Sequence, residues 1–231
     1  MKNKPFLQPL IHKETITPLE MNDFHLIFSK TFKLINKRNF EFTEESKNLY
    51  NTLVHYFYGM DDFYESPCLI KDKNNPSLDK GLIIIGNPGV GKSAILKTFE
   101  YIFWNLCIFN PNFSFKMISA NDMVSQFESL QNPLERKEFN SLMGKAFKCF
   151  DDLKSEREAS NFGKVNVMKE VLFNRYDNES RTIITCNYDD NFPDDYEKSL
   201  DEFGIKYDSR IYDRIFEMFN IIEVKGKSFR R

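Results

Sequence analysis

The chain is 231 residues long and carries 32 basic and 34 acidic residues, for a formal net charge of −2. This length fits one large domain, or a core with a small accessory domain. A hydrophobic content of 41% with 24 phenylalanines supplies a sizeable, largely aromatic core. A near-neutral chain is not a general polyanion binder, so any contact with nucleic acid must come from a local patch.

The cysteines and the apolar runs point to a reducing compartment. The four cysteines are far apart and never form a Cys-x-x-Cys pair, so the sequence suggests neither a zinc knuckle nor a disulfide framework. The first residues lead into a mixed polar stretch instead of a signal peptide. No apolar run approaches the length of a membrane span. We therefore expect a cytoplasmic protein that does not interact with a membrane.

Residues 1–75 are predicted to form a small helical region in front of a larger core. Helical spacing of apolar residues indicates one helix over 19–35, after an irregular arm over 1–17. Acidic residues in a first turn indicate a second helix over 43–58. The polar segment 68–80 is predicted to be a loop. We expect this N-terminal region to be available for binding a partner.

From residue 76 onward, apolar strands alternate with helices. Strands are predicted over 81–85, 113–118, 146–150, 181–186 and 220–224. Helices are predicted over 92–107, 120–130, 164–176 and 207–219. Residues 131–145 are polar and ambiguous, and an acidic loop with Pro193 precedes the last helix. This alternation predicts one α/β domain over 76–231, with a five-stranded parallel sheet covered by helices on both faces.

The first chemical motif joins the strand over 81–85 to the helix that follows it. It has the G-x-x-x-x-G-K-[ST] pattern of a phosphate-binding P-loop and consists of Gly86-Asn87-Pro88-Gly89-Val90-Gly91-Lys92-Ser93. Its glycines allow backbone N–H groups to surround a polyphosphate at a helix N-terminus. Lys92 is expected to reach the β- and γ-phosphates, and the Ser93 hydroxyl to bind Mg²⁺. We predict a nucleotide site over these eight residues and the next one, Ala94.

Paired acids end the predicted strand over 146–150. An apolar strand that ends in acids downstream of a P-loop is typical of the element that holds Mg²⁺. Asp151 is expected to hold the metal, directly or through water, and Asp152 to orient or deprotonate the attacking water. Lys148 departs from the pattern, because this strand is usually apolar throughout. The alternative interpretation is a strand end capped by solvated acids.

Asn187 ends the predicted strand over 181–186. In one division of P-loop proteins, an extra strand lies between the P-loop strand and the acidic strand. The polar residue at its carboxyl end then points at the γ-phosphate and the attacking water. Asn187 fits this sensor position, and the alternative is an asparagine that opens a turn.

Two basic features lie near the end of the chain. Arg210 begins the last predicted helix, where it could stabilise phosphoryl charge in the site of a neighbouring subunit. Local ion pairing with Asp208 or Asp213 is the alternative. The basic tail over 225–231 could contact phosphates with Phe229 stacked on a base, although a solvated terminus explains it equally well.

In this order, the motifs resemble those of an AAA+ ATPase of the DnaC/DnaI helicase-loader and IstB group. The P-loop is followed by Phe150-Asp151-Asp152-Leu153 with Glu156, Thr185-Cys186-Asn187, Ser209-Arg210-Ile211-Tyr212-Asp213-Arg214 and Gly226-Lys227-Ser228-Phe229-Arg230. The last two stretches resemble that group's arginine-finger helix and its terminal G-x-S-x-R. The resemblance covers residues 80–231. Lys154 departs from it, because the group usually has glycine there, and the N-terminal region does not clearly match.

The resemblance implies an activity, a cofactor and an assembly. It implies ATP hydrolysis with Mg²⁺, catalysed by Lys92, Asp152, Asn187 and Arg210, in a ring or spiral oligomer whose Arg210 acts across a subunit interface. It also implies that the core binds single-stranded DNA and that the N-terminal helices bind a replicative helicase. Because the chain stops soon after the fifth strand, no C-terminal lid domain is expected.

Three other functions remain open on the sequence. The first is an IstB-like ATPase that assists a transposase on duplex DNA. The second is a small-molecule kinase, which would need a lid with clustered arginines, whereas residues 131–145 offer only Arg136. The third is a nucleotide-bound scaffold that does not hydrolyse, because the acidic strand is imperfect.

Overall fold

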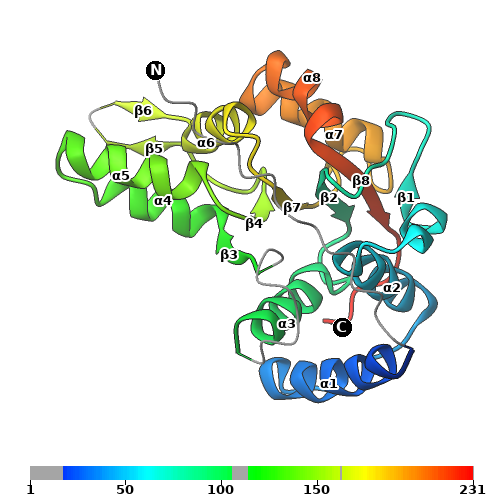
Figure 1. Ribbon diagram of the computed structural model, residues 1–231. Helices are drawn as coiled ribbons and strands as arrows, with labels where there is room; N and C mark the ends of the chain where they lie inside the picture. Colours follow the sequence, from blue (N-terminus) through cyan, green and yellow to red (C-terminus); the bar gives the residue numbers. More distant parts are fainter. Residues whose placement is uncertain (1–17, 106–113, 162, 231) are drawn as a thin grey trace, which may run out of the picture.

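The computed structural model describes residues 18–105, 114–161 and 163–230, and its centre is a six-stranded sheet (Figure 1). The strands in chain order are Leu69–Ile70 (β1), Gly81–Gly86 (β2), Lys116–Ser119 (β3), Lys148–Leu153 (β4), Thr182–Cys186 (β7) and Phe219–Val224 (β8). Their spatial order is β1-β8-β2-β7-β4-β3. All neighbours pair in parallel except β1, which runs antiparallel to β8 at one edge.

The predicted α/β class and the parallel strands are therefore confirmed, with one addition. Strand β1 lies in the segment predicted to be a loop, because a two-residue strand is too short to show an alternating pattern. The predicted strand over 113–118 begins at Lys116, and its first residue lies outside the described ranges. β7 lies between the P-loop strand β2 and the acidic strand β4, as the sensor interpretation of Asn187 requires.

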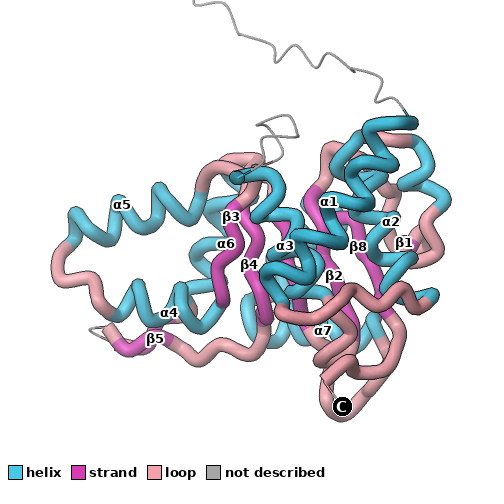
Figure 2. The backbone as a smooth tube through the Cα atoms, turned by 90° about the horizontal axis from the view of Figure 1, so that it is seen from below, coloured by secondary structure: helices cyan, strands magenta, loops and turns pink. Residues whose placement is uncertain are grey.

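Helices cover both faces of the sheet (Figure 1). One face carries α1 (Pro18–Asn36), α2 (Glu44–Tyr58) and α3 (Lys92–Asn105). The other carries α4 (Ala120–Glu128), α5 (Pro133–Gly144), α6 (Val167–Asp177), α7 (Tyr196–Tyr207) and α8 (Ser209–Met218). A short 3-10 helix (Asp61–Glu65) and a small hairpin of β5 (Ala159–Ser160) and β6 (Lys164–Val165) complete the fold. In Figure 2, α4, α5 and β5 lie at the β3 end of the sheet, and α2 and β1 lie at the other.

The two cores alternate along each strand, because successive side chains of a strand point to opposite faces. In β2, which is buried throughout, Leu82 and Ile84 join the core under α1–α3, and Ile83 and Ile85 join the core under α4–α8. The α1–α3 core contains more aromatic rings than the α4–α8 core, which holds the buried Met123, Met143 and Met168.

The two N-terminal helices pack on the helix that follows the P-loop. The rings of Phe24 and Phe28 on α1 lie 5.6 and 5.4 Å from the ring of Phe99 on α3. Thr43 caps α2 by accepting a hydrogen bond from the Ser46 backbone N–H. Helices α1 and α2 therefore share a hydrophobic core with α3. The predicted irregular arm over 1–17 lies outside the described residues.

One loop prediction is corrected in the α4–α8 layer. The predicted helix over 207–219 is present as α8, which begins at Ser209, whereas the acidic segment before it, predicted as a loop, forms α7. Asp195 caps α7 by accepting from the Lys198 N–H, and Leu200 and Phe203 bury one side of it. The acids and Pro193 masked this helical spacing, because they also favour turns.

The ambiguous segment over 131–145 contains α5. Asn132 caps this helix, and Phe139 and Met143 are its only buried apolar side chains. Two buried side chains give too weak a period for a prediction from sequence. None of the helices within the described ranges is long and apolar enough to cross a membrane.

A buried arginine organises the amino ends of β4 and β7. The Arg175 guanidinium donates to the carbonyl oxygens of Met143 (2.6 Å) and Ala146 (2.8 Å) and to Thr182 Oγ1 (2.6 Å). Burial lowers its pKa to about 10. Lys148 lies at this same end of β4, three positions before Asp151. The Lys148 charge therefore lies outside the apolar centre of β4 and away from the acidic residues that follow it.

Candidate nucleotide site

The P-loop joins β2 to α3 and takes its shape from its glycines. Gly89 and Gly91 have φ angles of 88° and 98°, in the left-handed region that favours glycine. Gly86 ends β2 so close to β8 that an added Cβ would collide with the carbonyl oxygen of Val224. The turn and the first turn of α3 are completed by the other predicted binding positions, Asn87, Pro88, Val90 and Ala94.

The Lys92 side chain lies against the P-loop and is buried. Its Nζ donates to the carbonyl oxygens of Gly86 (2.6 Å) and Asn87 (3.0 Å) and to Asn187 Oδ1 (3.0 Å). Burial lowers the pKa of Lys92 to about 8, and the nearby carboxylates oppose this shift. The Lys92 ammonium is thus held beside the P-loop, where a bound anion would stabilise its charged form.

Ser93 meets the end of the acidic strand. Its Oγ donates to Asp151 Oδ1 over 2.7 Å, and Thr185 Oγ1 donates to the same oxygen over 2.6 Å. A serine hydroxyl and a carboxylate are hard oxygen ligands of the kind that Mg²⁺ prefers. The donor set therefore fits a magnesium ion, with Ser93 and Asp151 as the residues that would hold it.

Asp152 adopts a left-handed conformation, with φ of 61°. Its carboxylate accepts from Asn187 Nδ2 (3.0 Å) and Ser155 Oγ (2.9 Å). Because Asn187 also accepts from Lys92, its amide connects the P-loop lysine to the second acid. The structure thus brings five predicted residues into one hydrogen-bonded group: Lys92, Ser93, Asp151, Asp152 and Asn187.

Thr185 is a residue of this group to which sequence reasoning assigned no role. Besides donating to Asp151, its Oγ1 accepts from the backbone N–H of Asp152 over 2.9 Å. The pairing of β4 and β7 shifts register after Phe150, and this hydroxyl bridges the shift. Thr185 stands two positions before Asn187, on the same face of the strand. The spacing of two residues between Thr185 and Asn187 was the signal in the sequence that could have identified Thr185.

Arg210 lies apart from this group in the described chain. Its Nε donates to Asp208 Oδ1 over 3.2 Å, and its guanidinium lies 5.1 Å from the centre of the Phe173 ring. The side chain is 70% exposed. Local pairing with Asp208, the alternative noted from sequence, is present, and the exposure leaves the side chain accessible to a second subunit.

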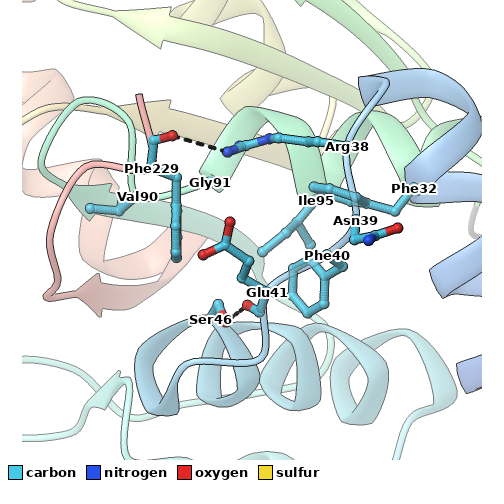
Figure 3. Close-up of a pocket in the computed structure, with 10 residues that line it drawn as sticks. All are labelled: Phe32, Arg38, Asn39, Phe40, Glu41, Ser46, Val90, Gly91, Ile95 and Phe229. Atoms are coloured by element: carbon cyan, nitrogen blue, oxygen red, sulfur yellow. Dashed lines mark hydrogen bonds between the residues drawn. The ribbon is translucent and has the colours of Figure 1, made fainter. Parts of the chain in front are cut away.

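The C-terminal tail packs on the P-loop and closes one side of a small pocket (Figure 3). The Phe229 backbone N–H donates to the Gly89 carbonyl oxygen over 3.0 Å, and Arg38 Nη1 donates to the Phe229 carbonyl oxygen over 3.2 Å. Phe229, Val90 and Gly91 face the segment between α1 and α2 across this pocket. The pocket adjoins the P-loop through Val90 and Gly91.

The comparisons with known proteins support the fold. No protein-family model matches the chain, and no curated protein matches it by sequence. The crystal structure of the DnaC helicase loader matches with a TM-score of 0.50 at 19% identity, over 82% of this chain and 95% of that one. The crystal structure of DnaI matches with a TM-score of 0.48 at 19% identity, over 82% of this chain and 89% of that one. The chain thus has the fold of the DnaC helicase loader, in agreement with the resemblance of its motifs.

Proposed function

We propose that this protein binds ATP with Mg²⁺ at the P-loop and hydrolyses it. The observation that carries the proposal is the hydrogen bond of 2.7 Å between Ser93 and Asp151. It joins residues 58 positions apart in sequence at the N-terminus of α3, and this supports our proposal that both residues hold the metal.

Each residue of the group has a distinct task in this proposal. Lys92 exchanges its carbonyl acceptors for phosphate oxygens and holds the nucleotide. Ser93 and Asp151 hold Mg²⁺, which when bound neutralises charge on the β- and γ-phosphates. Asp152 orients the attacking water and accepts its proton, and Asn187 fixes the Asp152 carboxylate.

We further propose that the protein acts as a DnaC-like helicase loader that binds single-stranded DNA. The fold supports this function, as does the order of the motifs. Exposed Arg210 would complete the site of a neighbouring subunit in a ring or spiral. The N-terminal region over 1–75 would bind the helicase, and the exposed Leu26 and Leu34 on the outer side of α1 offer apolar contacts.

The nucleotide proposal is tested by binding of a fluorescent ATP analogue with and without Mg²⁺. Lys92→Ala should weaken binding at least 100-fold. Asp151→Asn should remove the dependence on Mg²⁺ while leaving metal-free binding intact. Lys97→Ala changes an exposed lysine on the same helix and should bind like the wild type. Unchanged affinity in Lys92→Ala overturns the proposal.

Steady-state ATP turnover with single-stranded and with duplex DNA tests the rest of the function. A helicase loader should respond to single strands, whereas stimulation by duplex DNA alone favours a transposase partner. Nucleotide binding without turnover in either case favours a scaffold. A pull-down with residues 1–231, and with Leu26→Asp as the control bait, asks whether a helicase is retained through α1.

A further inference from the structure

The loop that follows Asp152 is bound to the end of α7 by a buried tyrosine. The backbone N–H of Lys154 donates to the Tyr207 hydroxyl over 3.0 Å, and that hydroxyl donates to Glu156 Oε1 over 2.7 Å. Lys206 Nζ adds hydrogen bonds to the carbonyl oxygens of Lys154 and Glu156. Four residues therefore form one contact between this loop and α7, which we call the Tyr207 contact: Lys154, Glu156, Lys206 and Tyr207.

The Tyr207 contact contains a buried carboxylate, that of Glu156, and burial is unusual for this group. The Glu156 side chain is 3% exposed, and its Oε1 lies 3.2 Å from Lys206 Nζ. Among the described residues, Glu156 Oε2 has no hydrogen-bond partner. Burying a carboxylate is costly unless its bonds are retained. Burial and the adjacent Glu156 raise the pKa of Tyr207 well above its ordinary value, so its hydroxyl remains a donor.

Backbone strain lies on both sides of the contact. On the loop side, Asp152 and Lys154 have φ angles of 61° and 75°, in the left-handed region that favours glycine. After Tyr207, Asp208 has φ of 138° and ψ of 147°, a conformation that is almost restricted to glycine. Such conformations persist where the surroundings hold them in place. The Tyr207 contact joins these two strained segments, and Lys154 Nζ adds hydrogen bonds from the same loop to the Ser199 carbonyl oxygen (3.3 Å) and to Glu202 on α7.

The contact is adjacent to the helix that carries Arg210. Asp208 caps α8 by accepting from the Arg210 backbone N–H over 3.0 Å, and it also accepts from Arg210 Nε and from Lys169 Nζ (2.9 Å). A continuous path of short steps therefore runs from Asp152 through Lys154 and Tyr207 to Asp208 and Arg210.

We infer that Tyr207 and Glu156 are positioning residues that couple the Asp152 carboxylate to Arg210 of the same subunit. This inference rests on the proposed ATPase function. A change at Asp152 on nucleotide binding moves the loop over 152–156, and the Tyr207 contact transmits that change to the cap of α8. The state of one nucleotide site would in this way set the arginine that the subunit offers to its neighbour.

Tyr207→Phe removes the hydroxyl and keeps the ring. In the full chain, we expect kcat for ATP to fall at least tenfold while KM stays within twofold, because nucleotide binding residues are untouched. Tyr56→Phe is the matched control, since the buried Tyr56 hydroxyl donates to a backbone carbonyl at Lys80, before β2. Glu156→Gln keeps an oxygen acceptor and should retain most of kcat, whereas Glu156→Ala should resemble Tyr207→Phe.

Hydrogen exchange tests the coupling without relying on turnover. In Tyr207→Phe, backbone exchange should accelerate at least tenfold both in 152–157 and in 209–213, and nucleotide should no longer protect the second segment. Wild-type kcat in Tyr207→Phe, or acceleration in one segment alone, overturns the inference. If wild-type protein binds no nucleotide, the proposed function fails, and exchange in the two segments still decides whether they are coupled.

Discussion

The two faces of the sheet differ in the interactions that stabilise the segments packed on them. On the α1–α3 face, phenylalanine and tyrosine rings contact one another across α1, α2 and α3, and the unusual backbone angles of the P-loop fall on glycines. On the α4–α8 face, the strained positions Asp152, Lys154 and Asp208 are not glycines and are held by polar contacts.

This difference suits the two faces to different tasks: the first to binding phosphate, and the second to changing conformation when nucleotide binds. A loop shaped by glycines and followed by a helix packed in an aromatic core needs little from distant residues, so it suits a site that is ready for phosphate. Strained residues that are held by a few hydrogen bonds can relax to a second backbone conformation when those bonds break. This suits a segment whose conformation changes when nucleotide binds. The following predictions test whether the two faces differ in this way.

The largest effect is expected from truncating the centre of the aromatic core. Phe99 lies within 5.2–6.1 Å of five other rings: those of Phe24, Phe28, Tyr50, Phe57 and Phe103. Phe99→Ala should lower the free energy of unfolding by about 3–5 kcal/mol. Chemical denaturation measures this, with Leu172→Ala on the other face as the comparison. A smaller loss at Phe99 than at Leu172 would contradict the larger contribution expected from packing on the α1–α3 face.

The next effect concerns the polar support of the α4–α8 face. Arg175→Lys keeps the charge and removes the planar fork that reaches several carbonyl oxygens. We expect a loss of about 3 kcal/mol in unfolding free energy, since buried carbonyls lose their donors. Urea denaturation of this variant beside Lys169→Arg measures it, because Lys169 is partly exposed and pairs with Asp208. Equal stability of the two variants would show that the buried fork is dispensable.

A moderate effect is expected from pH on nucleotide binding. The pKa of Lys92 is about 8 in the free protein, and a bound polyphosphate must raise it. Below that pH the lysine is charged in both states, so affinity should be constant. Above it, binding takes up a proton, and affinity should fall about tenfold per pH unit. Titrations from pH 6.5 to 9.5 measure the slope, which Lys92→Arg should abolish because arginine stays charged.

The smallest effect concerns Lys148. Burial and nearby Arg175 lower its pKa, so the folded state disfavours its charge. Lys148→Met should raise the unfolding free energy at pH 7 by about 1 kcal/mol. Because the unfolded lysine binds its proton more tightly, wild-type stability rises as pH increases from the folded pKa toward 10.5, and the difference should shrink there. Thermal unfolding at pH 7 and pH 10 checks both signs.

Sequence predicted those parts of the fold that depend on local pattern. The buried strand β2, the P-loop and the capped helix α2 each carry a signal within a few residues. The acids at 151 and 152 and Asn187 were found because each ends an apolar strand downstream of a P-loop. Their hydrogen bonds join residues far apart in sequence, and the geometry of those bonds has no local signal.

The remaining features depend on long-range packing. Helix α7 was missed because its acids favour a loop, although Leu200, Phe203 and Tyr207 have helical spacing. The role of Thr185 appears only where β4 shifts register against β7. The contact of Phe229 with Gly89 joins the two ends of the domain, and a terminal phenylalanine gave no indication of it.

That contact also provides a simple way to observe the P-loop. Trypsin cleaves after Lys225, Lys227 and Arg230, which flank the residue held against Gly89. The rate at which the protease trims this tail therefore depends on how firmly the tail lies on the nucleotide site. A time course on a gel, with and without nucleotide, would follow the loop in unlabelled protein.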